Sequence, residues 1–168
     1  MRLVKGFILA MAGLFIMITL VSLLIPSRVT VTRGVEVNAT ASKVFAEINN
    51  LRNWQHWHPV FKNDSSKISY GNNSSEWETN GKKNKFLITA DSGQQVTISL
   101  EREGENAVTN FISVLPLSDS NRVQVEWRAF TKLKWYPWEK FYGIFIERFS
   151  GPGYEEALKG LKDYMEGH

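Results

Sequence analysis

The sequence contains no cysteine and only three histidines. Without cysteine the chain cannot form a disulfide, so redox chemistry neither supports nor opposes a location outside the cytoplasm. The sequence also lacks an HExxH metal motif, paired cysteines, a glycine-rich phosphate loop and a nucleophile elbow. We therefore assign no catalytic residue, no metal site and no cofactor, and we favour a binding function while leaving an enzyme open.

The two internal histidines, His56 and His58, flank Trp57. On a short helix or an extended turn these imidazoles point in different directions and cannot readily share one metal ion. We expect both at the surface or at the rim of a cavity. The alternative is that one of them acts as an acid or base at a cavity mouth. Its candidate partners are Asp91, Glu126 and Arg128.

The chain also has little net charge, +3 from 20 basic and 17 acidic residues. Arg2 and Lys5 are the only basic residues before Arg28, so 18 basic and all 17 acidic residues lie beyond Ser27, and that part carries a net charge of about +1. No dense Lys/Arg stripe occurs. A lysine cluster at residues 82–85 follows Asn-Gly and is typical of a solvated turn, so we expect no nucleic-acid partner.

A long apolar run near the N-terminus is the most informative positive feature. Residues 7–25 contain no charge and, as a helix rising about 1.5 Å per residue, would span about 28 Å, close to the ~30 Å hydrocarbon core of a bilayer. A buried helix of a soluble protein would show a polar stripe, whereas here the polar positions are Thr19 and Ser22. The run predicts a membrane-spanning segment.

A cleaved secretory signal is the competing interpretation, because it too has a basic start and an apolar middle. Cleavage requires small residues in an A-x-A-like pattern, but Leu23, Leu24 and Ile25 stand just before Pro26 and Ser27. We therefore predict that residues 1–27 form an N-terminal membrane anchor, with the membrane contacted through residues 7–25.

Flanking charge gives a small bias in orientation. Arg2, Lys5 and the amino terminus lie on one side of the run, and Arg28 and Arg33 lie close to it on the other. Because positive charge favours the cytoplasmic side, we expect a single-pass membrane protein with a cytoplasmic N-terminus and an extracytoplasmic domain.

The remaining residues, 28–168, have the length of one ordinary domain. At its start Val29, Val31, Val35 and Val37 alternate with polar residues, which is typical of a half-buried strand. Arg33 falls on the apolar side of this alternation. We expect it at the rim of the sheet, or before the inward-facing part of the strand begins.

Two short helical segments follow. Asn-Ala-Thr at 38–40 is a helix-start signal, and apolar residues then recur at helical spacing through residue 51. A second helical turn is expected over residues 51–57, stopped by Pro59.

From residue 67 the period changes to the alternation of strands. Turn-forming residues at 79–82, 91–93 and 103–105 indicate hairpins, and successive hairpins predict an antiparallel meander. The expected strands cover residues 67–70, 75–79, 85–90, 94–103, 106–115 and 122–130. Beyond them the pattern is helical over 137–149, interrupted at Ser-Gly-Pro-Gly 150–153, and helical again from Tyr154.

Three segments carry a resemblance to the START-like, or helix-grip, superfamily of polyketide cyclase/dehydrase and lipid-transport domains. They are residues 35–45 (VEVNATASKVF), 48–59 (INNLRNWQHWHP) and 153–162 (GYEEALKGLK). The resemblance covers nearly all of residues 28–168. It implies an α+β fold in which a curved antiparallel sheet wraps around a C-terminal helix and encloses a mostly apolar cavity. The interruption at 150–153 departs from the single long helix of the family, and residues 137–149 are expected as a separate helix at the cavity mouth or the membrane.

The aromatic content suggests which side chains would line such a cavity. Six tryptophans, ten phenylalanines and five tyrosines offer large apolar surfaces with few rotamers to freeze. Ordinary core packing is the competing role for each of them. The candidate ligand-binding residues are Trp54, Trp57, Trp77, Phe111, Trp127, Phe141 and Phe145.

Trp135, Tyr136 and Trp138 allow a second interpretation. They lie beside Lys132 and Lys134, and clustered Trp and Tyr next to lysines resemble an interfacial membrane belt. The alternative is that they form a buried edge of the domain.

Three classes of function are compatible with these features. The favoured one is a membrane-anchored domain that binds an apolar small molecule or lipid in a cavity between the sheet and the C-terminal helix. The second is an enzyme of the cyclase/dehydrase type, and the third is a ligand-free interaction module of the cell envelope. Fold resemblance alone cannot choose among them, because function depends on the site.

Overall fold

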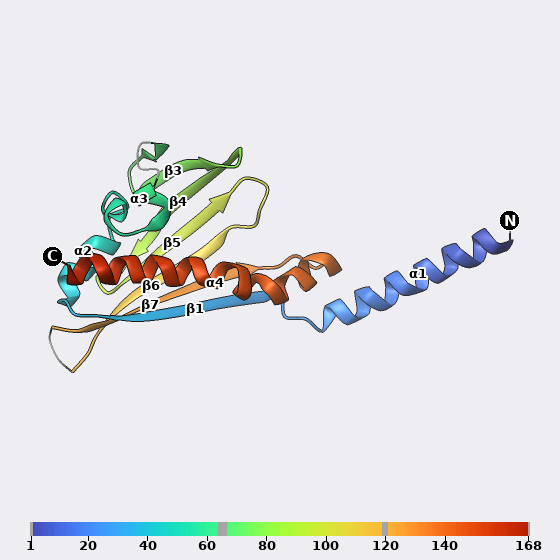
Figure 1. Cartoon of the computed structure of the whole chain (residues 1–168). Coiled ribbons are helices and arrows are strands. Elements are labelled where there is room, and N and C mark those ends of the chain that lie inside the picture. Colours follow the sequence, from blue (N-terminus) through green and yellow to red (C-terminus); the bar gives the residue numbers. More distant parts are fainter. Residues whose placement is uncertain (1, 64–66, 119–120, 168) are drawn as a thin grey trace.

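The computed structural model describes residues 2–63, 67–118 and 121–167. A long helix, α1 (Arg2–Leu23), projects from an α+β domain in which a second long helix, α4 (Pro137–Glu166), lies along an antiparallel sheet (Figure 1). The strands are β1 (Arg28–Val37), β2 (Ser69–Tyr70), β3 (Ser74–Thr79), β4 (Lys82–Asp91), β5 (Gln95–Arg102), β6 (Val108–Pro116) and β7 (Val123–Lys132). The predicted START-like fold class is confirmed.

The sheet is the predicted meander closed by its first strand. The strand order is β1-β7-β6-β5-β4-β3-β2, and each neighbouring pair is antiparallel. β1 pairs with β7 along its whole length, from Arg28 opposite Lys132 to Val37 opposite Val123. This pairing brings the segment that follows α1 against the segment that precedes α4.

The predicted hairpin turns use residues that tolerate a positive φ. Asn80 and Gly81 have φ values of 53° and 74° between β3 and β4, and Gly93 and Gly104 have φ values of 79° and 78° in the next two turns. Glycine adopts this left-handed region at no steric cost, and asparagine does so more readily than most residues. The turn positions were therefore readable from the sequence.

The short helices differ in one respect from the expectation. α2 (Ala41–Ile48) begins after Thr40 as predicted, and a short 3-10 helix, η1 (Asn53–His56), follows it. Pro59 does not end the helical segment but begins a further helix, α3 (Pro59–Asn63). Proline suits the first helical position because its missing N–H would have no intrahelical partner there.

α4 is one continuous helix of 30 residues, so the predicted break at 150–153 is wrong. Proline inside a helix removes one backbone hydrogen bond, and glycine lowers helix propensity, so the local sequence favours an interruption. The helix nevertheless continues through Pro152, because tertiary contacts on both sides of this residue hold it against β1.

Arg33 makes the most direct of these contacts. Its Nη1 donates to Glu147 Oε1 at 3.2 Å and its Nε donates to Glu155 Oε1 at 2.6 Å. The guanidinium lies against Gly151, where any side chain would meet it. Arg33 thus holds α4 on both sides of Pro152, and its position on the inward face of β1 is explained by this contact with the helix.

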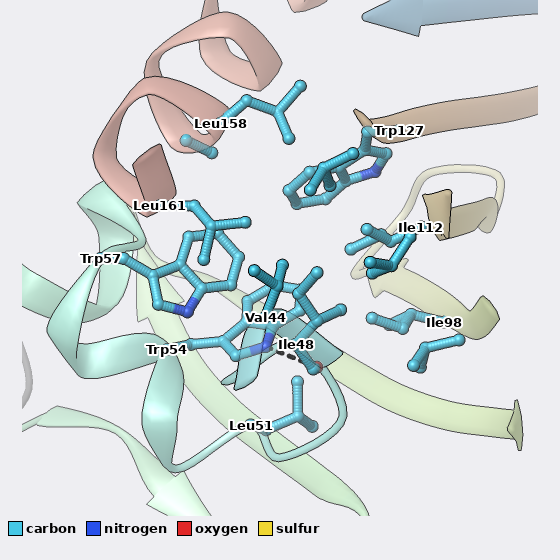
Figure 2. Close-up of a cluster of buried hydrophobic side chains, with 14 of the residues drawn as sticks. Val44, Ile48, Leu51, Trp54, Trp57, Ile98, Ile112, Trp127, Leu158 and Leu161 are labelled. Atoms are coloured by element: carbon cyan, nitrogen blue, oxygen red, sulfur yellow. Dashed lines mark hydrogen bonds between the residues drawn. The ribbon is translucent and has the colours of Figure 1, made fainter. Parts of the chain in front are cut away.

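Two hydrophobic clusters join the helices to the sheet. The larger contains Trp54, Trp127 and Leu161 and lies under the C-terminal half of α4 (Figure 2). Within it the indole Nε1 of Trp54 donates to the Ile48 carbonyl at 2.9 Å. The smaller consists of Val31, Ala129, Leu133 and Ile146 and lies under the N-terminal half of α4.

α1 stands apart from this core. Ser22 is its one buried residue among those described, and the apolar side chains along the rest of the helix are exposed. Its 22 residues extend about 33 Å, which is long enough and apolar enough to cross a membrane. The helix begins at Arg2 and ends at Leu23, two residues before the end of the apolar run.

Candidate functional site

An open cleft of about 690 Å³ lies between the sheet and the N-terminal half of α4. Side chains from β3 to β7 form its floor, residues between η1 and α3 form one wall, and α4 forms the other. Because α4 packs mainly along β1, it leaves the face of the middle strands uncovered at this point (Figure 1).

The inner wall of the cleft is aromatic. Trp77 on β3 and Phe86 on β4 have ring centroids 5.0 Å apart, and Trp127 on β7 lies 5.2 Å from the ring of Tyr154 on α4. Trp77 and Phe86 come from neighbouring strands, whereas Trp127 lies three strands away from Phe86 in the sheet and Tyr154 comes from the helix above it. Such a surface can contact a flat or branched apolar molecule with few rotamers to freeze.

Asn110 is the buried polar residue of the cleft floor. Its side-chain oxygen accepts a hydrogen bond from Trp127 Nε1 at 2.9 Å, and its Nδ2 donates to the carbonyls of Ile98 and Val108 at 3.4 and 3.2 Å. Asn110 is fully buried, so these bonds replace the water it loses on folding. The bonds fix the orientation of the Trp127 indole in the wall.

His58 also lines the cleft, and here the expectation of a surface or rim histidine is wrong. The residue is only 8% exposed and is surrounded by aromatic rings. Burial lowers the pKa of its imidazole from 6.5 to about 3, so the ring is uncharged at neutral pH. This burial could not be predicted from the sequence, because the residue lies in a short connection where periodicity does not define an inner face.

His56, two residues earlier, lies at the surface as predicted. Its Nδ1 is 3.1 Å from Glu47 Oε2, and its ring stacks on Tyr164 with centroids 5.0 Å apart. The two histidines point in different directions. In the part of the chain that the structure describes, no group of three or more potential ligands could hold a metal ion.

The mouth of the cleft is polar and charged. Arg102 donates from Nε to Asn84 Oδ1 at 2.8 Å and pairs through Nη1 with Glu105 Oε2 at 3.3 Å. Asn106 donates to the Lys132 carbonyl at 3.2 Å and to Glu139, which joins the β5–β6 turn to the start of α4. If a ligand with a charged end entered here, that end could stay in water at the mouth.

Tyr154 stands on α4 between the mouth and the inner wall. Burial raises the pKa of its phenol to about 12, and the positive charge of Arg102 opposes this shift. The phenol is therefore un-ionised at neutral pH and adds a neutral polar group to an otherwise aromatic wall.

The structure divides the seven predicted ligand-binding residues into three groups. Trp77 and Trp127 line the cleft. Trp54 and Trp57 are buried in the larger core cluster beside it, with ring centroids 4.9 Å apart (Figure 2). The remaining residues, Phe111, Phe141 and Phe145, do not line the cleft.

Strand parity explains the position of Phe111. It follows Asn110 and pairs with Arg128, so it points to the face opposite Asn110 and packs edge-on against Phe130 at 5.4 Å. Trp127 points inward, so its neighbour Arg128 points outward. Phe111 pairs with Arg128, so a consistent use of the alternation would have placed Phe111 on the outer face as well. Phe141 is half-buried, and Phe145 is exposed with its ring centroid 6.5 Å from that of Phe149, outside the lining of the cleft.

Four exposed aromatic side chains lie on the N-terminal half of α4 and just before it. We call Trp135, Trp138, Tyr142 and Phe149 the aromatic rim; they are 68%, 65%, 58% and 69% exposed. Trp138, Tyr142 and Phe149 also line the cleft, so its apolar wall continues onto the surface. Large exposed aromatic side chains grouped in this way mark an interaction surface.

The end of α1 is fastened next to this rim. Lys140 donates from Nζ to the Ile25 carbonyl at 2.9 Å and to Ser27 Oγ at 2.5 Å, and the Leu133 amide donates to the Ser27 carbonyl at 2.9 Å. These bonds tie the connection between α1 and β1 to the start of α4. The C-terminal end of α1 and the start of α4, whose residues Trp138 and Glu139 line the cleft, consequently lie at the same end of the domain (Figure 1).

Comparisons with known proteins agree with this architecture. Residues 28–166 match the family model described as polyketide cyclase / dehydrase and lipid transport. A START superfamily protein from Mycobacterium smegmatis has a TM-score of 0.60 at 15% identity, and the match covers 82% of this chain and 97% of that protein. No curated protein matches the chain.

Two further solved structures have similar scores. The Zhui aromatase/cyclase from a Streptomyces species has a TM-score of 0.59 at 12% identity, covering 83% of this chain and 94% of that one. The protein XoxI from Bacillus cereus has a TM-score of 0.59 at 19% identity, covering 82% and 96%. At these identities the likeness shows the fold alone.

Proposed function

The chain belongs to the polyketide cyclase/dehydrase and lipid-transport family, and we propose that it is a membrane-anchored domain that binds an apolar small molecule or lipid in the cleft beneath α4. In this proposal residues 1–27 are the anchor and residues 28–168 are the binding domain. The ligand enters and leaves at the bilayer surface.

The observation that carries the proposal is the aromatic cleft itself. Its volume of about 690 Å³ lies within the range of small-molecule sites, roughly 300–1,000 Å³. Trp77, Phe86 and Trp127 give it an apolar floor, and the fixed hydrogen bond between Trp127 and Asn110 keeps that floor rigid. A rigid apolar pocket reduces the entropy lost on binding.

The position of the mouth supports the membrane part of the proposal. Four residues connect α1 to β1, a reach of about 14 Å when fully extended, so a membrane-spanning α1 would hold the domain at the headgroups. The aromatic rim and Lys134 would then lie at the interface, where Trp, Tyr and Lys are favoured. A ligand could pass between the leaflet and the cleft without crossing open water.

A direct test is to purify the full chain in mild detergent and identify the molecules that copurify, by native mass spectrometry followed by organic extraction. Val108→Trp would fill the cleft from its floor, because Val108 lines it. Leu115→Trp is the matched control on the same strand, since Leu115 is 47% exposed and lies outside the cleft lining. We expect an apolar species with the wild type and the control and a large loss with Val108→Trp. Equal recovery from all three would contradict binding in this cleft.

The orientation across the membrane needs its own test. We propose a cytoplasmic N-terminus and an extracytoplasmic domain, because Arg2 and Lys5 precede the apolar run. A reporter active only outside the cytoplasm, fused after the last residue, should be active. Silence of that reporter, with activity of a cytoplasmic one at the same position, would reverse the assignment.

His58 is the specific observation that favours the second candidate, a cyclase/dehydrase-type enzyme, because a histidine in a cleft wall could transfer protons. Its pKa of about 3 weakens that role, since efficient proton transfer requires a pKa near the working pH. The binding function is therefore the better supported of the two. The ligand-free module, with its interior filled by its own aromatic side chains, is less compatible with an open cleft.

A further inference from the structure

The backbone at His58 is held firmly in place. Its amide donates to the Trp54 carbonyl at 2.8 Å, and its carbonyl accepts hydrogen bonds from the amides of Phe61 and Lys62 at 3.0 and 2.9 Å. The residue thus joins η1 to α3, and its backbone cannot move away from the cleft wall without breaking these bonds. Position 58 is a fixed point of the site.

The imidazole is surrounded by rings that offer it no strong hydrogen bond. The nearest centroids belong to Trp54 at 5.1 Å and Phe61 at 5.2 Å, followed by Trp57 at 5.5 Å. Phe86 and Trp127 lie at 6.1 Å on the cleft side. In an apolar pocket of this kind a polar atom without a partner is costly.

Nδ1 of His58 is such an atom. It is buried and has no hydrogen-bond partner among the described residues, so it is closed to the cleft, and Nε2, which is not one of the buried unpaired atoms, is the ring nitrogen that a ligand in the cleft can reach. Asn110, the other buried polar side chain of the cleft lining, already uses its oxygen for Trp127 and its nitrogen for two carbonyls. Among the described lining residues, unused hydrogen-bonding capacity is therefore found at His58 on the inner wall and at the phenol of Tyr154 nearer the mouth.

The charge state of the ring limits what it can bind. A neutral imidazole has one donor and one acceptor nitrogen, and burial among five aromatic rings disfavours the charged form. It therefore suits a hydroxyl or a carbonyl but has no charge with which to pair a carboxylate or phosphate. The charged side chains of the lining, Arg102, Glu105, Lys134 and Glu139, belong instead to the mouth.

We propose that His58 recognises one uncharged hydrogen-bonding group, a hydroxyl or a carbonyl, at the inner end of an otherwise apolar ligand. This inference rests on the proposed function, since it names the ligand class of the same cleft. It assigns His58 a role in specificity and not in proton transfer. An amphipathic ligand with a charged end would place that end at the mouth.

The test compares three probes of one shape: naphthalene, uncharged 2-naphthol and anionic 2-naphthoate. Binding to the full chain in detergent is measured by equilibrium dialysis against protein-free micelles, so that partition into detergent is subtracted. We expect 2-naphthol to bind about tenfold more tightly than naphthalene, as one added hydrogen bond allows, and 2-naphthoate to bind no better than naphthalene.

Three variants separate recognition from packing. His58→Phe should bind naphthalene and 2-naphthol equally, because it keeps the ring but loses the hydrogen bond. His58→Gln, which retains a donor and an acceptor, should recover part of the preference. His56→Gln, the matched change at the surface histidine, should keep the full preference.

The wild type also tests the proposal without any variant. In protein labelled with nitrogen-15 at histidine, 2-naphthol should shift the ring signals of His58, assigned by their disappearance in His58→Phe, and naphthalene should shift them less. Equal affinities in the wild type, or an unchanged preference in His58→Phe, would overturn the role of His58 while leaving an apolar cleft. Failure of every probe to bind would also contradict the proposal that the cleft binds apolar molecules.

Discussion

The two halves of α4 have the same backbone but opposite surroundings. In the C-terminal half Ala157, Leu158 and Leu161 are buried against the larger core cluster. In the N-terminal half Trp138, Tyr142 and Phe149 are exposed beside the cleft mouth and the end of α1. The C-terminal half holds the helix on the sheet, and the N-terminal half leaves apolar surface free for another partner.

This contrast shows why a single helix can carry both stability and binding. Burial of the C-terminal half fixes the axis of the helix, and Arg33 transmits that position past Pro152 by bonding to Glu147 and Glu155. The N-terminal half packs through Ile146 on the smaller cluster and leaves its aromatic side chains exposed over the cleft. Exposed aromatic surface of this size is unfavourable in water, so we expect it to be covered in the cell.

The largest expected effect is on stability and comes from the buried half. Leu161 is fully buried, so Leu161→Ala should lower the free energy of unfolding by about 2–5 kcal/mol, because it leaves a cavity in the core. Ile144→Ala, at a 59% exposed position of the other half, should change it by less than about 0.5 kcal/mol. Urea unfolding followed by tryptophan fluorescence measures both, and equal losses would remove the contrast.

The next effect on stability concerns the buried imidazole of His58, in the cleft wall. The folded pKa of His58, about 3, lies below its ordinary value of 6.5, so below pH 6.5 the unfolded chain takes up a proton that the folded chain does not. Stability is therefore lost as the pH falls. Between pH 8 and pH 5 the wild type should lose about 2 kcal/mol more than His58→Phe. Parallel pH profiles from urea unfolding would show that His58 is not buried in its neutral form.

Two glycines in α4 should respond to the same substitution with opposite signs. A methyl group at Gly160 would overlap the Trp57 carbonyl, which is backbone, so Gly160→Ala should cost about 1–3 kcal/mol of stability. At Gly153 nothing lies within 4 Å, so Gly153→Ala should stabilise the helix by about 1 kcal/mol. Thermal or urea unfolding of the two variants distinguishes these outcomes. Destabilisation by Gly153→Ala would mean that the Pro152 region is not a regular helix.

The smallest effect on stability should come from the aromatic rim. Replacing both Trp135 and Trp138 by Phe should change the free energy of unfolding by no more than about 0.5 kcal/mol, because both are exposed. In vesicles containing brominated lipids the same change should about halve the quenching of tryptophan fluorescence, since these indoles would lie at the interface. Trp77→Phe, inside the cleft, is the control and should leave the quenching almost unchanged.

Strands and turns were the most readable part of the sequence. The alternation over Arg28–Val37 and the Asn-Gly turn before β4 act over two to four residues, so each signal is complete within its own segment. The continuity of α4 was not readable. The contacts that accompany it include the pair between Arg33 and Glu147, which are 114 residues apart in sequence, and no local rule connects the two.

The candidate site was readable only in part, for a related reason. Trp77 and Trp127 were found because large aromatic residues on strands are good candidates for an inner face. Phe145 was proposed on residue type alone, and its helix face turned out to point to solvent. His58 and Asn110 were missed because their burial depends on which elements pack above them.

By itself the sequence determined the order of the strands, the hairpin turns and the apolar character of α1, because these follow from local periodicity and from residues with special backbone preferences. Only the tertiary structure decided that α4 continues through Pro152, that His58 loses its charge, and that the cleft opens beside α1. Each of these depends on contacts between segments far apart in the chain, whose packing energy exceeds the local preferences that the sequence expresses.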